Sequence, residues 1–276
     1  MNTFKKTTLA LAISALAGGA LAQSAPAPAP EPSPITANVT VVNDYRYRGI
    51  SQSNFKPAIQ GGFDYAHESG FYIGNWNSSI SWISDANSAG GRNNVSAPIE
   101  MDFYAGFKKE LIEKGFASDL GVLQYYYPTT GLPSSATNPN TTEIYVAQNF
   151  TFGPVTGFVK FSYAVSNIFG FANSSGSYYP DLTLNYDTGI WGITANAHIG
   201  YQYVAGNYSR TVSNSSLYSY TDYKLGLTKD FGGGLSLSAA YVTTNAGKSG
   251  ATYNYSSPTG KNLGGSTGIV SLTKTF

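Results

Sequence analysis

The sequence contains no cysteine and has two histidines among its 276 residues. Without cysteine, a chain of this length must draw its stability from a core or from closure of a sheet, not from disulfides. His67 and His198 lie far apart in the sequence, which makes a poor metal site. No serine or other nucleophile stands in a recognisable pattern with a base and an orienting group. We therefore expect no enzyme, no cofactor and no metal.

Charge and long apolar runs are also scarce. Charged residues make up 11% of the chain and form no basic stripe, so nucleic-acid binding is not expected. The apolar run near the start follows Lys5 and Lys6 and ends at a small-x-small site, Ala20 to Ala22, which is typical of a secretory signal peptide. No later stretch reaches the roughly 20 apolar residues of a membrane helix. The pattern predicts a signal peptide over 1–22, a Pro/Ala-rich extended linker over 23–34 and one folded unit over 35–276.

Aromatic residues and glycine are abundant, and after residue 35 apolar and polar residues alternate with a period of two. This period is that of a β-strand with one apolar face. In the clearest stretch, Trp191, Ile193 and Ala195 alternate with Gly192 and Thr194. About twelve such strands are predicted, over 37–49, 58–66, 71–83, 99–108, 116–127, 142–150, 155–165, 178–186, 190–203, 218–229, 235–243 and 268–276.

The connections between these strands alternate between tight and long. The tight ones are 67–70, 109–114, 152–154, 187–189 and 230–234, and the long ones are 85–95, 128–140, 166–177, 206–216 and 245–266. Bacterial outer-membrane barrels have short periplasmic turns, long extracellular loops and an even number of strands. The sequence therefore predicts an all-β protein, a transmembrane antiparallel up-and-down β-barrel with both termini in the periplasm.

Three positions test this interpretation. The apolar phase changes within 71–83, which predicts a β-bulge near Asn75. Lys274 interrupts the apolar face of the last strand, and near the periplasmic interface its amine could reach water. Phe276 ends that strand and resembles the signal read by the barrel assembly machinery.

If the apolar faces meet lipid, the polar faces line a lumen. The candidate pore-lining residues are Arg46, Arg48, Asp64, Glu100, Asp102, Glu143, Lys160, Asp222 and Lys224. Opposed charges could form a pore that selects small solutes through a transverse field. The alternative is that they neutralise one another and plug the barrel, because a twelve-stranded lumen is smaller than that of the large aqueous porins.

Arg46 and Arg48 are predicted to point the same way, just before the first outer loop. Two guanidinium groups so placed could bind an anion in bidentate fashion. Alternatively they pair with Glu100 and Asp102 as structural clips, since charges shielded from water are normally paired.

Several motifs resemble the TorF family of proposed porins from Gram-negative bacteria. They are Tyr47-Arg48-Gly49, the run 57–62, the run 70–74, the acidic strand around Glu100 and Asp102, and the end 271–276. The resemblance covers the whole mature chain, is clearest over 45–78, and implies an outer-membrane barrel with a pore of unspecified substrate.

Pattern and resemblance together predict a porin-like channel in the bacterial outer membrane for passive diffusion of small solutes or ions. The alternative is a non-conducting structural or adhesive barrel. Outer-membrane lipid and lipopolysaccharide, the barrel assembly machinery and small solutes are the expected partners. A barrel phospholipase of the Ser–His type is not expected, because no serine follows His198 at the required spacing.

Overall fold

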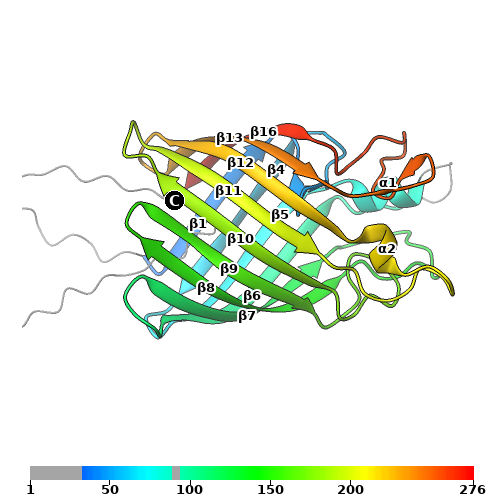
Figure 1. Ribbon diagram of the computed structural model, residues 1–276, viewed down its shortest axis with the longest axis horizontal. Helices are drawn as coiled ribbons and strands as arrows, with labels where there is room; N and C mark the ends of the chain where they lie inside the picture. Colours follow the sequence, from blue (N-terminus) through cyan, green and yellow to red (C-terminus); the bar gives the residue numbers. More distant parts are fainter. Residues whose placement is uncertain (1–32, 89–93) are drawn as a thin grey trace, which may run out of the picture.

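Twelve strands close into one antiparallel barrel in the computed structural model, which describes residues 33–88 and 94–276 (Figure 1). Each strand pairs with its neighbours along the chain, and β1 closes the ring against β16. This confirms the predicted fold class. The predicted signal peptide and nearly all of the predicted linker lie outside the described residues. The barrel strands are β1 (Ile35–Val42), β4 (Ala58–Ala66), β5 (Phe71–Ser79), β6 (Ile99–Glu110), β7 (Phe116–Tyr126), β8 (Thr141–Phe152), β9 (Val155–Ala164), β10 (Tyr178–Asp187), β11 (Ile193–Gln202), β12 (Tyr220–Asp230), β13 (Leu235–Thr244) and β16 (Thr267–Thr275).

The outer face of the barrel is apolar. Val41, Ile59, Val146, Leu225 and Leu272 are all exposed although each is large and hydrophobic. They occupy alternate strand positions, so the residues between them point into the lumen. An apolar outer band around a polar interior is the arrangement of a membrane barrel.

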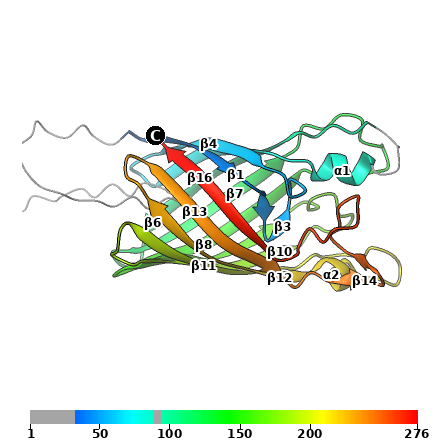
Figure 2. The ribbon, with the colours of Figure 1, turned by 90° about the horizontal axis from the view of Figure 1, so that it is seen from above.

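The two ends of the barrel differ as the connection lengths predict. Short turns lie at the end where the chain terminates, and the opposite end carries the longer loops (Figures 1 and 2). Those loops contain the short helices α1 (Trp82–Ser88) and α2 (Asn214–Tyr218) and the two-stranded sheet of β14 (Lys248–Ser249) and β15 (Thr252–Tyr253). Across residues 33–88 and 94–276, no helix is long and apolar enough to cross a membrane.

The first strand is shorter than predicted. β1 ends at Val42, and the chain then turns into the lumen as a hairpin of β2 (Arg46–Tyr47) and β3 (Ile50–Ser51). Arg48 and Gly49 form its tip with backbone φ values of 45° and 78°. The prediction that strand one extends to Gly49 is wrong. We call residues 43–57 the inner loop.

The predicted bulge near Asn75 is also wrong. β5 keeps an unbroken register on both sides, with Asn75 opposite Phe63 of β4 and Phe103 of β6. Trp76 therefore points into the lumen, where its ring packs at 5.5 Å from that of Tyr45 in the inner loop. The apolar phase changes because apolar residues of the inner loop pack against this side of the lumen, so an inward-facing residue such as Trp76 can also be apolar.

β5, β11 and β12 also begin or end inside their predicted ranges. β5 stops at Ser79, and Ile83 lies in α1, buried against the inner loop and the neighbouring lumen residues. β11 begins at Ile193, so Trp191 lies in the preceding turn with a φ of 52°. Tyr218 belongs to α2 and not to the following strand. In each case the predicted strand overruns into a turn or a helix.

Candidate functional site: the constricted lumen

The inner loop is held in the lumen by Arg46. Its Nε donates to the Asp44 carboxylate at 2.6 Å, and its Nη1 donates to backbone carbonyls of Gly49, Leu263 and Gly265. Leu263 and Gly265 belong to the last outer loop, so one guanidinium ties the first and last outer loops together. Such charge-assisted hydrogen bonds are among the stronger ones in proteins.

Two tyrosine hydroxyls meet one carboxylate where the inner loop contacts the wall. Tyr45 donates to Glu100 of β6 at 2.5 Å, and Tyr127, just after β7, donates to the other oxygen at 2.7 Å. Burial, reinforced by the Glu100 charge, raises the pKa of Tyr45 and of Tyr127 well above the usual tyrosine value. Both hydroxyls therefore stay protonated and keep donating.

Arg48 carries the tip of the hairpin to the far wall. Its guanidinium donates to Glu143 of β8 at 2.7 Å and to Gln202 of β11 at 2.6 Å, and it lies 4.1 Å from the ring centre of Tyr179 of β10. Burial alone would lower the pKa of Arg48, but the Glu143 carboxylate together with Tyr47 and Tyr125 outweighs it and the pKa is raised. The inner loop thus crosses from β1 and β4 to strands on the other side of the ring.

Gly49 allows this close approach. A Cβ at this position would lie 2.4 Å from Cγ2 of Thr244 and 2.8 Å from Cβ of Asp222. Its positive φ also favours glycine. The tip therefore rests directly on β12 and β13.

A chamber of about 260 Å³ lies beside the hairpin and is lined by charged residues. His198 of β11 bridges Asp181 and Asp222 at 3.0 and 2.9 Å. Lys160 and Lys224 line the same chamber, and the Lys160 amine lies 4.0 Å from the ring centre of Tyr145. The chamber therefore carries both signs of charge.

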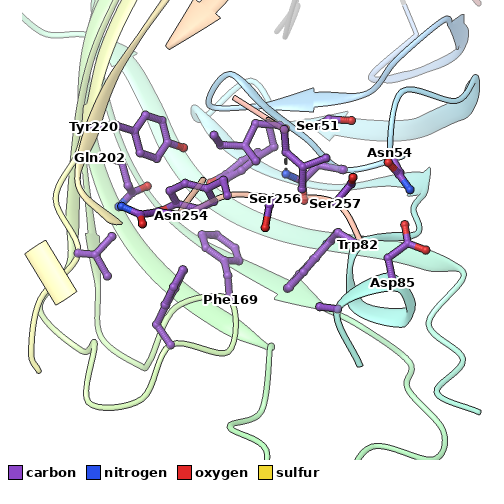
Figure 3. Close-up of a pocket in the computed structure, with 18 of the residues that line it drawn as sticks. Ser51, Asn54, Trp82, Asp85, Phe169, Gln202, Tyr220, Asn254, Ser256 and Ser257 are labelled. Atoms are coloured by element: carbon purple, nitrogen blue, oxygen red, sulfur yellow. Dashed lines mark hydrogen bonds between the residues drawn. The ribbon is translucent and has the colours of Figure 1, made fainter. Parts of the chain in front are cut away.

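A second cavity, of about 190 Å³, lies among the hairpin, α1 and the outer loops (Figure 3). Trp82, Phe169 and Tyr220 contribute its aromatic wall, and amides and hydroxyls supply most of its polar groups. Tyr47 lines both cavities. We call the first cavity the inner chamber and the second the outer pocket.

Seven of the candidate pore-lining residues point inward from strands, and two do not lie on barrel strands. The residues that point inward from barrel strands are Asp64, Glu100, Asp102, Glu143, Lys160, Asp222 and Lys224. Arg46 and Arg48 sit in the inner loop. Their predicted pairing with Glu100 and Asp102 is wrong, because Arg46 pairs with Asp44 and Arg48 with Glu143. The inner loop turns before Arg46, which changes the groups within reach.

Tyrosine–carboxylate pairs are the feature that the sequence did not reveal. Besides the Glu100 pair, Tyr104 donates to Asp64 at 2.6 Å and Tyr179 donates to Asp222 at 2.7 Å. Tyr72 donates to Asp119, a lumen residue that sequence reasoning missed, at 2.7 Å. The only available signal was tyrosine on the polar phase of a strand, as at Tyr104.

The ring of twelve strands, the short turns and the polar lumen define a porin-like transmembrane β-barrel. Two solved porins share this fold. The NanC porin is 11% identical, with 87% of this chain and 98% of the porin covered and a TM-score of 0.54. The KdgM porin is 7% identical, with 88% and 98% covered and a TM-score of 0.50.

Residues 26–276 match the model of the Gcw_chp family, described as bacterial protein of unknown function, and the chain belongs to this family. No curated protein matches the chain. The match does not name the TorF family, so that resemblance stays a prediction.

Proposed function

We propose that this protein is an outer-membrane channel for the passive diffusion of small solutes or ions. The observation that carries the proposal is the inner chamber, a charged cavity within the lumen of a closed barrel. A barrel built only for structure has no need of lysines facing an internal cavity, because buried charge is costly unless it is paired. The porin folds of NanC and KdgM support the same class of function.

The charges that would select solutes are the two chamber lysines and not the arginines. Arg46 and Arg48 are engaged by Asp44 and Glu143, whereas within the described ranges the amines of Lys160 and Lys224 form no hydrogen bond or ion pair. The carboxylates of Asp181 and Asp222 both contact the His198 ring instead. The lysines are therefore free to interact with a passing anion, and we expect a preference for anions.

Planar-bilayer recordings of the refolded protein test both points. Wild-type protein should give conductance steps with a reversal potential that indicates anion preference in a salt gradient. The double variant Lys160→Gln, Lys224→Gln should move that potential toward cations. The matched control is Lys109→Gln, Lys114→Gln, which removes two exposed lysines at a short turn. Equal reversal potentials in all three proteins would refute the role of the chamber lysines, and absence of any steps would refute the channel.

The alternative function is a non-conducting structural or adhesive barrel. One specific observation, the position of the hairpin, favours it. The tip of the hairpin contacts β8, β11, β12 and β13, and so crosses the lumen. A channel in which this hairpin can leave the far wall conducts, and a plugged barrel does not. Conductance of variants that release the hairpin, described in the Discussion, separates the two.

The proposal extends to the setting of the protein. The barrel would lie among outer-membrane lipid and lipopolysaccharide after export by the predicted signal peptide and insertion by the assembly machinery. Phe276 pairs with Ala37 through backbone hydrogen bonds and leaves its ring exposed, which suits the proposed assembly signal. Lys274 lies on the outer face, and its amine bonds to the Gly233 carbonyl in a short turn. The NanC and KdgM folds favour a channel over an enzyme.

A further inference from the structure

The outer pocket differs in chemistry from the inner chamber. It is formed by the hairpin, α1 and outer loops, and so lies at the end of the barrel that carries the long loops (Figures 1 and 3). Arg46, Arg48, Lys160 and Lys224 line the inner chamber and none of them lines the outer pocket. A solute arriving from the loop side meets the outer pocket first.

We propose that the outer pocket binds a neutral carbohydrate, at the scale of a mono- or disaccharide. As an entry site it rests on the proposed function, because it would supply solute to the channel. As a binding site it does not, because occupancy needs only the folded barrel.

Aromatic walls supply the first argument. Trp82 lies on one side of the pocket, Tyr220 on the other and Phe169 between them (Figure 3). Sugar rings present C–H groups on their faces and hydroxyls around their edges. Large rings with apolar faces can cover such C–H groups, while polar groups at the pocket margin meet the hydroxyls.

An unpaired hydroxyl supplies the second argument. Tyr220 is 5% exposed, and its hydroxyl forms no hydrogen bond within the part of the chain that the structure describes. Figure 3 shows this hydroxyl directed into the pocket. Ser256 of the last outer loop and Asn54 of the inner loop also line the pocket. A wholly apolar ligand would displace water from the Tyr220 hydroxyl without replacing the lost hydrogen bond, whereas a sugar hydroxyl replaces it.

The charge of the lining supplies the third argument. Asp85 is the charged group among the lining residues, and its carboxylate accepts a hydrogen bond from Ser81. Among the lining residues that the structure describes, an acidic sugar would meet this carboxylate and no cation. The Arg48 guanidinium does not line the pocket, and it is engaged by Glu143 and by the side-chain oxygen of the lining residue Gln202. The site therefore favours an uncharged sugar over an acidic one.

Tryptophan fluorescence tests the site directly. The variant Trp76→Phe, Trp191→Phe keeps Trp82 as its single tryptophan, which lies in the pocket wall. Maltose, cellobiose and sucrose are the probes, with digalacturonate, choline and indole as comparisons. At least one neutral disaccharide should change the Trp82 emission in a saturable way at concentrations where the comparison compounds do not. Calorimetry on the wild-type protein repeats the titration in case the variant folds poorly.

The variant Tyr220→Phe removes the unpaired hydroxyl and keeps the ring. It should weaken binding of the neutral sugar by about three- to tenfold, the equivalent of one hydrogen bond. Tyr208→Phe, at an exposed tyrosine of an outer loop, is the matched control and should leave the affinity unchanged. Failure of all three disaccharides to bind, stronger binding of digalacturonate, choline or indole, or equal affinities of the two tyrosine variants would overturn the proposal. Sugar binding without conductance would support the sugar site and refute the channel function. Conductance without sugar binding would support the channel function and refute the sugar site.

Discussion

Replacing Arg48 by methionine should release the hairpin from the far wall of the lumen. The side chain of Glu143 is 2% exposed and lies 2.7 Å from the Arg48 guanidinium. Removing one partner of a buried ion pair strands the other charge and costs about 3–5 kcal/mol. Methionine keeps the apolar stem, so the change removes the charge and its hydrogen bonds more than it removes volume. Tyr125, 3.4 Å from Glu143, offers a weak second donor and moderates the effect.

This cost falls on docking of the hairpin and not on the barrel. The twelve strands are held by their own continuous registers, which Arg48 does not join. Because 1.4 kcal/mol is a factor of ten, the population with an undocked hairpin should rise by roughly two to three orders of magnitude. Single-channel recordings should show larger or longer conductance steps than the wild type, and hydrogen exchange should show lost protection of backbone amides over residues 46–51.

Two further variants control for charge. Arg210→Met removes an exposed arginine of an outer loop and should behave as the wild type. Arg48→Met combined with Glu143→Gln removes both charges, so no carboxylate is stranded and part of the amide protection should return. If Arg48→Met leaves both conductance and exchange at the level of Arg210→Met, the ion pair does not hold the hairpin and the reasoning is wrong.

Three other changes address the same loop. Gly49→Val should undock the tip of the hairpin, because the new Cβ would lie 2.4 Å from Thr244 and a positive φ costs an L-residue about 1–2 kcal/mol. Unchanged amide protection over residues 46–51 would contradict this prediction. Tyr127→Phe should lower the free energy of unfolding in detergent by about 1–3 kcal/mol, since Glu100 loses one hydrogen-bond donor. Its control is Tyr126→Phe, because Tyr126 is exposed on the outer face. Raising the pH above about 10, the ordinary tyrosine pKa, should weaken docking progressively, because the raised pKa of Tyr45 means that the folded state holds this proton more tightly than the unfolded state. The loss of hairpin protection should be smaller in Tyr45→Phe, and an equal loss in both proteins would assign the effect to another group.

Alternation and loop length were enough to predict the barrel because both are local. β6 runs from Ile99 to Glu110, close to its predicted range, and its inward residues Glu100 and Asp102 are those that the pattern indicated. The alternation of a strand reports which face is apolar, and ring closure follows when every strand has such a face. The order of the strands around the ring then follows because strands that succeed one another along the chain pair with each other.

The inner loop could not be predicted in the same way. Tyr45 and Tyr47 continue the apolar phase of β1, and Arg46 and Arg48 its polar phase, so the sequence reads on as a strand. What bends it is contact with residues far along the chain, among them Glu143 and Leu263. The supposed bulge has the same origin, since Trp76 faces inward against Tyr45. The entry of one segment into the lumen thus accounts for both wrong predictions, the length of the first strand and the bulge. Both depend on contacts between residues distant in the sequence, which local patterns do not report.

The tyrosine–carboxylate pairs bear on how the lumen would treat charge. A tyrosine hydroxyl satisfies a carboxylate by hydrogen bonding but leaves its negative charge in place, whereas arginine cancels it. Glu100 on β6 receives two tyrosine hydroxyls and no cation. In the ring of twelve strands β12, which carries Lys224, stands six places from β6 in either direction, and so on the opposite wall. The carboxylate of one wall therefore faces a wall that carries Lys224 beside Asp222, and replacing the chamber lysines should leave the carboxylates of both walls dominant and turn the channel toward cations.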